Sequence, residues 1–184
     1  MFLRRWGGMK MAKFSNITKF TIGTYEVDIP INHLIKQLES YDKEYNLELN
    51  PDFQRGNVWT EEQQIAYLEF FFRDGRSARV IYFNIGVWGD DKNTDIPNMV
   101  CVDGLQRLTA FIRFFNNEIP VFGSYYKDYE DRPHYTLKFN INNLTYKKDV
   151  LKWYIEMNSG GTVHSKEELE RVKAMIKDGW NENG

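Results

Sequence analysis

The stretch PNMVCVDGLQRLTAFIRFF, residues 97–115, decides the fold expected for this chain. Residues 99–103 form a short apolar run typical of a buried strand, and residues 104 to about 117 repeat apolar side chains at helical spacing. A helix that begins directly after a strand leaves its first backbone N–H groups without partners. Because these donors and the helix dipole attract anions, the junction predicts phosphate recognition.

The residues at this junction suit that chemistry. Gly104 has no Cβ and would let a phosphate approach the main chain, where the amides of Gly104 and Leu105 would fix an oxygen. Gln106 adds amide donors, and Arg107 adds a planar fork of donors that fits phosphate oxygens. Asp103 would cap the helix, orient Arg107 or hold a Mg²⁺ ion. The plainer alternative is that Asp103 is only an N-cap, Gly104 a tight turn and Arg107 a surface charge.

Two further loops carry polar residues at helix ends. The loop NPDFQRGNVWT (50–60) contains Gln54 and Arg55 and leads into TEEQ (60–63), which is a capping box. Two arginines, each at the mouth of a helix, would clamp one polyphosphate or one nucleic-acid backbone; alternatively, Arg55 is solvated. The loop EMNSGGTVHS (156–165) offers Asn158 and two glycines, which also suit an ordinary helix end.

The rest of the chain mixes short strands with helices and has no regular βαβ rhythm, which predicts an α+β fold. Strands are expected at 20–30, 78–88, 99–103 and 135–141, with 78–88 and 99–103 forming a hairpin-like unit. Helices are expected at 31–45, 60–73, 104–117 and 147–158, and a terminal helix begins with a capping box at 165. In the helix 60–73, Ile65, Leu68 and Phe72 are expected to form the inner stripe. We expect a flexible N-terminal extension at 1–19 and a single domain at 20–184.

Composition limits the classes of function. The 184 residues carry 24 basic and 26 acidic side chains, so phosphate binding must come from a local site. Phe, Tyr and Trp make up 16% of the chain, which favours some aromatic side chains at an interface or a cleft. The single cysteine, Cys101, is expected to be a buried hydrophobe, and the chain is expected to be cytoplasmic with no membrane segment.

The three polar segments together resemble a known family, the N-terminal domain of GmrSD-type modification-dependent restriction systems, which is a ParB/sulfiredoxin-like domain. The family pattern P-x-[FY]-Q-R-x-x-V-W stands here as PDFQRGNVW (51–59). V-D-G-Q-Q-R-L-T stands as VDGLQRLT (102–109), and N-x-x-G-x-x-L-S-x-x-E-L stands as NSGGTVHSKEEL (158–169). The three matches occur in the family's order.

The resemblance implies a small mixed sheet with packed helices, nucleotide binding and hydrolysis, and DNA restriction in conflicts between phage and host. The expected ligands are NTP with Mg²⁺, or DNA, and the expected activity is that of a phosphoester hydrolase, either an NTPase or an endonuclease. Carried over by position, the catalytic residues would be Asp103, Gln106 and Arg107, and Asp103 would be the metal ligand. The phosphate-binding residues would be Gln54, Arg55, Gly104, Leu105, Arg107 and Asn158.

Two departures from the family pattern keep an alternative open. Leu105 replaces the first glutamine of the motif, which removes an amide that would position a phosphate or an attacking water. The three histidines, His33, His134 and His164, are scattered and do not support an HNH nuclease mechanism. The alternative is a non-catalytic interaction module, such as a phage protein that binds host DNA-processing or defence proteins. A homo-oligomer is compatible with either function.

Overall fold

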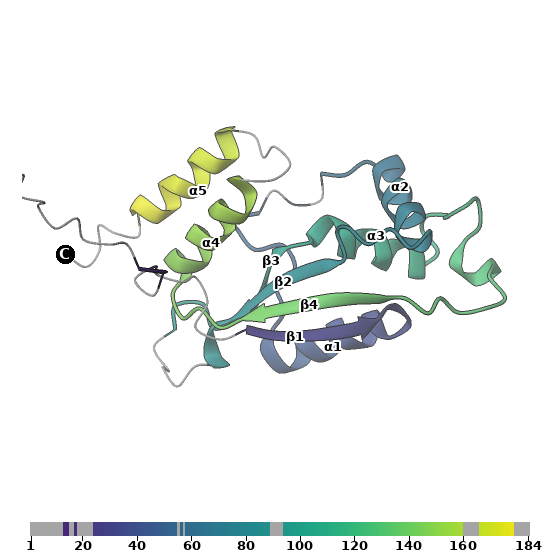
Figure 1. Cartoon of the computed structure of the whole chain (residues 1–184), viewed down its shortest axis with the longest axis horizontal. Coiled ribbons are helices and arrows are strands. Elements are labelled where there is room, and N and C mark those ends of the chain that lie inside the picture. The colour runs from purple at the N-terminus through teal and green to yellow at the C-terminus, as the bar shows by residue number, and fades with distance from the viewer. Residues whose placement is uncertain are drawn as a thin grey trace, which may run out of the picture.

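The computed structural model describes residues 13–14, 17, 24–54, 56, 58–88, 94–159 and 166–178. Within these ranges the chain forms a four-stranded mixed sheet and five α-helices (Figure 1), which confirms the α+β class. The ParB/sulfiredoxin likeness within that class stays a prediction. Most of the expected extension at 1–19, Arg55 and the capping residue Ser165 lie outside the described residues.

The sheet places β3 at one edge, where the chain turns into the candidate site. Its strands are β1 (Thr24–Pro30), β2 (Val80–Ile85), β3 (Met99–Asp103) and β4 (Thr136–Asn142), in the order β1-β4-β2-β3. β4 pairs antiparallel with β1 and parallel with β2. β2 and β3 pair antiparallel, so the expected hairpin-like unit is confirmed.

Five helices surround the sheet, with α1 below it, α2 and α3 at the right, and α4 and α5 at the upper left of Figure 1. They are α1 (Leu34–Tyr45), α2 (Glu61–Phe72), α3 (Leu105–Phe115), α4 (Lys147–Ser159) and α5 (Lys166–Asp178). The capping box predicted at 60–63 is present, because the Thr60 hydroxyl accepts from the Gln63 amide and the Gln63 side chain accepts from the Thr60 amide. The helix predicted at 31–45 begins with a 3-10 turn, Ile31–His33.

β3 joins two hydrophobic cores because its successive side chains point to opposite faces of the sheet. Met99 and Cys101 belong to the larger core, which packs α1, α2 and α3 against the sheet. Val100 and Val102 belong to a smaller core with Phe53 and with residues of α4 and α5. β3 is therefore fixed from both sides, and the residues that follow it start from a rigid position.

Cys101 is fully buried in β3, as expected of a small hydrophobe. Burial raises the pKa of its thiol to about 12, and the nearby Asp103 carboxylate acts in the same direction. The thiol is therefore protonated at neutral pH and is a poor nucleophile. None of the described helices is both long enough and apolar enough to cross a bilayer.

Candidate functional site

The junction between β3 and α3 is a tight turn at Gly104. Its φ of 117° lies in the left-handed region, where residues with a Cβ are strained, and it forms the N-cap of α3. A Cβ at this position would lie 2.6 Å from Cδ1 of Ile81. Glycine is therefore required both by backbone conformation and by the close packing of Ile81. The role of Gly104 in letting a phosphate approach the main chain stays a prediction.

Arg107 binds the protein's own groups. Its Nη1 donates to the backbone carbonyl of Val80 over 2.7 Å, and its Nη2 donates to Oδ2 of Asp103 over 2.5 Å. The Arg107 side chain is 13% exposed and that of Asp103 is 39% exposed. This ion pair matches one of the roles expected for Asp103, the orientation of Arg107. The pair is neutral overall, and it ties the first turn of α3 to the start of β2.

Gln106 binds the loop 50–60 through both atoms of its amide group. Its Oε1 accepts from the backbone amides of Val58 and Trp59, at 3.0 Å each. Its Nε2 donates to the Gly56 carbonyl over 2.6 Å. One glutamine in the first turn of α3 therefore satisfies three backbone groups of a loop about fifty positions earlier in the chain.

Gln54 makes the reciprocal connection from the loop to the strand. Its Nε2 donates to the Cys101 carbonyl over 2.5 Å, so the loop is joined to β3 as well as to α3. Arg171 of α5 holds the same loop from the other side: its guanidinium donates to the carbonyls of Asp52 (2.9 Å), Phe53 (3.0 Å) and Gln54 (3.3 Å). Arg171 was not predicted from the sequence, although it lies just past the third motif.

Residues 103–107 and the loop 50–60 together form a region that we call the seam. The structure brings Gln54, Asp103, Gln106 and Arg107 into the seam, and it fixes the backbone at Gln54 and Gly56, on either side of Arg55. Asn158 is used differently, since its Nδ2 donates to the Tyr154 carbonyl one turn back in α4. Leu105 is buried, with 8% of its surface exposed.

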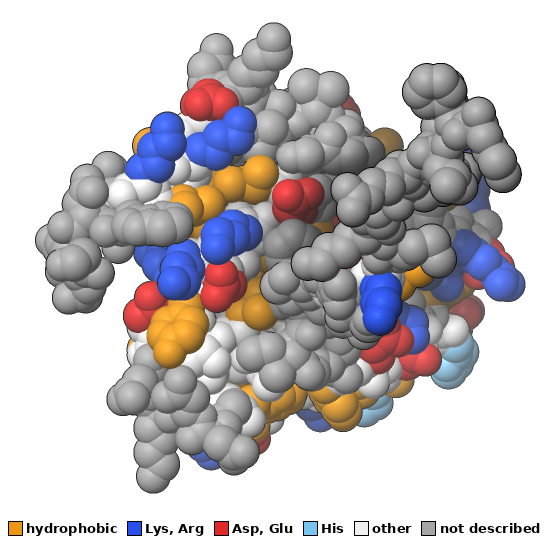
Figure 2. All heavy atoms as spheres, turned by 60° about the vertical axis from the view of Figure 1, so that its left-hand side comes forward, with side chains coloured by type: hydrophobic (Ala, Val, Ile, Leu, Met, Phe, Trp, Pro, Cys, Tyr) orange, Lys and Arg blue, Asp and Glu red, His pale blue; other side chains and the backbone are white. Residues whose placement is uncertain are grey.

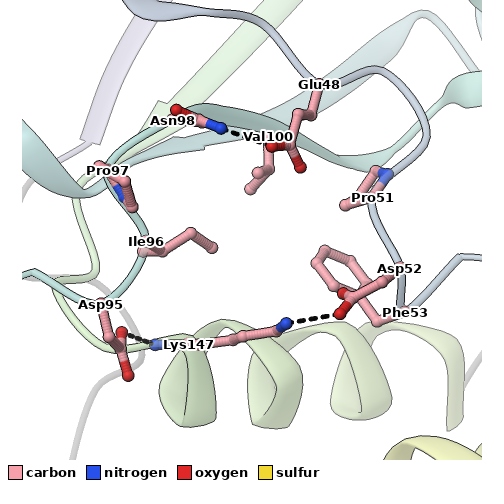
Figure 3. A pocket seen from close by; sticks show the side chains of 10 residues that line it. All are labelled: Glu48, Pro51, Asp52, Phe53, Asp95, Ile96, Pro97, Asn98, Val100 and Lys147. Carbon is pink, nitrogen blue, oxygen red and sulfur yellow. Dashed lines mark hydrogen bonds and ion pairs between the residues drawn. The ribbon is translucent and has the colours of Figure 1, made fainter.

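A small polar cavity of about 130 Å³ lies beside the loop, between the start of β3 and the start of α4 (Figure 3). Phe53, Ile96 and Val100 form part of its lining, and charged groups stand around it. The Lys147 ammonium pairs with Asp52 over 2.7 Å, and its backbone amide donates to Asp95. Asn98 donates to Glu48. Each carboxylate lining the cavity therefore already has a partner.

Charges of both signs alternate over the face that carries α4 and α5. Figure 2 shows Lys and Arg side chains on this face with acidic and apolar side chains between them. The described residues contain no group of three or more His, Cys, Asp or Glu side chains arranged to hold a metal ion.

The fold and the seam define an α+β domain in which two glutamine-arginine segments meet at a strand-to-helix turn. The sequence profile described as "GmrSD restriction endonuclease, N-terminal domain" matches residues 32–152, which is more than half of the chain. The chain therefore belongs to this family, as the three motifs suggested. Neither a search of curated proteins nor one of solved structures found a significant match.

Proposed function

We propose that this domain binds a phosphate group of DNA or of a nucleotide at the seam, as part of a system that restricts DNA. Family membership supplies the restriction context. The observation that carries the proposal is that Gln54, Gln106 and Arg171 hold the backbone next to Arg55 against the junction of β3 and α3. A loop held this firmly at a helix start would present an arginine in a defined position at low entropic cost.

The start of α3 supports anion binding in this arrangement. The helix has no side-chain N-cap and no acidic residue in its first turn, so its amide dipoles are not satisfied by a carboxylate of the same turn. Arg107 is neutralised by Asp103, and in our proposal it positions that carboxylate. Arg55 supplies the positive charge that binds phosphate.

Asp103 is the proposed Mg²⁺ ligand. Arg107 binds one of its oxygens, and the side chain is 39% exposed. Mg²⁺ commonly takes one or two carboxylates and fills its shell with waters and substrate phosphates, so a single protein carboxylate is sufficient when phosphate is present. The proposed reaction is attack of water on phosphorus with departure of the ester or diphosphate oxygen, favoured by charge stabilisation at the seam. The Leu105 side chain has no amide group to orient that water.

Arg55→Ala is the variant that tests binding. Arg107→Ala is less informative, because it would leave the Val80 carbonyl and the Asp103 carboxylate unpaired and would destabilise the fold. Binding of labelled ATP, GTP and a DNA duplex is measured for the wild type, for Arg55→Ala and for Arg76→Ala. Arg76 is a well-exposed arginine outside the seam, and its loss changes the net charge equally.

The expected result is that Arg55→Ala weakens binding by roughly tenfold to a hundredfold, the loss typical of hydrogen bonds to a charged group, while Arg76→Ala has little effect. If the wild type binds none of these ligands, or if the two variants weaken binding equally, a phosphate site at the seam is excluded. Catalysis is tested by Mg²⁺-dependent phosphate release and plasmid nicking. We expect Asp103→Asn to remove any activity, with thermal unfolding as the control for folding.

The second candidate is a non-catalytic interaction module, which is favoured by exposed apolar side chains. Phe70, Phe122 and Tyr125 are all exposed on the described surface, and exposed rings can contribute to a protein-binding surface. They would suit a host DNA-processing or defence protein, or a second copy of the chain. A wild type that unfolds cooperatively but binds neither nucleotide nor DNA would support this alternative.

A further inference from the structure

A second cavity, of about 170 Å³, lies at the other end of α3 from the seam. It is comparable in size to engineered cavities of about 150 Å³ that admit benzene. It is formed where Phe114, at the end of α3, meets the end of α2 and the segment between α3 and β4. Six aromatic side chains line it: Phe72, Phe114, Phe122, Tyr126, Tyr129 and Tyr135.

The rings of this aromatic cavity are held in place by their neighbours. Phe114 makes edge-to-face contacts with Tyr126, at 5.5 Å between centroids, and with Tyr129, at 6.0 Å. The Tyr129 hydroxyl donates to the Val121 carbonyl over 2.6 Å, and the Tyr135 hydroxyl donates to the Phe72 carbonyl over 2.7 Å. Since these hydroxyls are engaged with the backbone, Tyr129 and Tyr135 offer a ligand mainly their aromatic rings.

Asp131 is the one charged residue that lines the aromatic cavity. Its side chain is exposed, and no ion pair joins it to another residue in the described part of the chain. A carboxylate beside aromatic rings repels phosphate and attracts a cation. The electrostatic preference of this cavity is thus opposite to the preference proposed for the seam.

The rings of this region already hold cations of the chain itself. The Arg73 guanidinium lies 4.9 Å from the Phe122 ring centroid, and the Arg79 guanidinium lies 5.9 Å from that of Tyr135. Arg79 is neutralised by Asp74 at 2.9 Å. Glu69 adds a negative charge to this region: its carboxylate accepts from the Phe122 amide, and its charge adds to the desolvation that raises the pKa of Tyr129.

We propose that the aromatic cavity binds a quaternary ammonium group, with the rings around the cation and Asp131 balancing its charge. Such a cation suits the site because it is weakly hydrated, gains from the negative faces of aromatic rings and needs no hydrogen-bond acceptor. A neutral ligand of the same shape would gain only the free energy of burying its apolar surface, without the attraction between the cation and the rings. Small choline-like molecules and trimethylated lysine side chains of proteins both carry this group.

The test uses choline and its neutral isostere 3,3-dimethylbutan-1-ol, with binding followed by NMR of the Tyr and Phe ring signals of the full chain. A third titration uses a short peptide that contains trimethyllysine. Tighter binding of the peptide than of choline would indicate a protein-borne cation, and tighter binding of choline would indicate a small molecule. Asp131→Asn removes the proposed counter-charge. Glu130→Gln is the matched control, because Glu130 is an exposed neighbour that does not line the cavity.

We expect choline to bind and the neutral isostere to bind several-fold more weakly. Asp131→Asn should weaken choline binding by about twofold to fivefold, as for one solvent-exposed charge contact, and Glu130→Gln should leave it unchanged. Phe122→Leu, which keeps an apolar side chain but removes a ring, should weaken choline binding more than binding of the isostere. The proposal is overturned if choline shifts none of the ring signals, if the isostere binds as tightly as choline, or if the two acidic variants behave alike.

Discussion

Replacement of Gln106 by alanine should release the loop 50–60 from the start of α3 without unfolding the domain. The variant loses three hydrogen bonds, two accepted from Val58 and Trp59 and one donated to Gly56. At about 1 kcal/mol net for each bond, the total is about 3 kcal/mol. Because Val58 is exposed and water can replace its bond, the expected loss in the free energy of local opening is about 2 kcal/mol.

Hydrogen exchange of the Val58 and Trp59 amides measures this opening directly, since both amides donate to Gln106. A loss of about 2 kcal/mol corresponds to exchange that is roughly thirtyfold faster. Trypsin cleavage after Arg55 gives a second readout, because local opening of a loop makes it a better protease substrate. Thr109→Ala is the matched control, since Thr109 also lies in α3 but its hydroxyl donates within the helix, to the Leu105 carbonyl.

Gln106→Glu separates the two halves of the amide. A carboxylate still accepts from the Val58 and Trp59 amides, but its second oxygen would face and repel the Gly56 carbonyl. Exchange at the two amides should therefore be faster than in the wild type but slower than in Gln106→Ala. The reasoning would be refuted if Gln106→Ala left the exchange of both amides unchanged, or if Thr109→Ala accelerated it equally. Either result would mean that the loop is held by contacts other than Gln106.

Three further predictions follow from the same contacts. Gly104→Ala should lower the free energy of unfolding by about 3 kcal/mol, from a strained left-handed backbone and a clash with Ile81, measured by urea unfolding. Arg171→Ala should increase trypsin cleavage in the loop 50–60, whereas Lys173→Ala should not, because only the arginine binds the loop carbonyls. Cys101 should resist thiol reagents in the folded state; because its pKa rises from 9.0 to about 12 on folding, stability should fall as the pH rises between these values, with a shallower fall in Cys101→Ala.

The order and the type of the elements could be predicted from the sequence, because periodicity and caps are local signals. The strand 99–103 and the capping box at 60–63 are present as predicted. The buried face of α2 was predicted wrongly in part. Ile65, Leu68 and Phe72 were expected to form the inner stripe, but the buried apolar side chains of α2 are Tyr67, Leu68 and Phe71. Periodicity gives several adjacent apolar stripes in such an aromatic helix, and packing selects one of them.

Packing against α3 selects the stripe in this case. Tyr67 and Phe71 make edge-to-face contacts with Phe111, at 5.9 and 4.9 Å between ring centroids. The same rotation buries Gln64, whose Oε1 accepts from Arg113 of α3 and whose Nε2 donates to the Trp59 carbonyl. A polar residue on a buried face is stable only with such partners. These partners are distant in the sequence, so the local pattern could not indicate them.

The candidate site was predicted as a set of segments, but the roles of its side chains depend on long-range contacts. The sequence indicated that 50–60 and 103–107 act together, and the hydrogen bonds of Gln54 and Gln106 join them. Arg171 could not be foreseen, because it binds backbone carbonyls more than a hundred positions away, and a carbonyl is the same in every residue. The hydrogen bond from Arg107 to the Val80 carbonyl could not be predicted from the sequence for the same reason.

The chemistry of the seam explains why its motifs contain glutamine. The loop presents both N–H groups and a carbonyl to the start of α3, and only an amide side chain both accepts from the former and donates to the latter. Lysine cannot accept and glutamate cannot donate. An activity lost on substitution of Gln106 would therefore show that the loop must be ordered, and it would not show that Gln106 contacts the substrate. Arg55→Ala separates these cases, because it leaves Gln54, Gln106 and Arg171 in place to hold the loop.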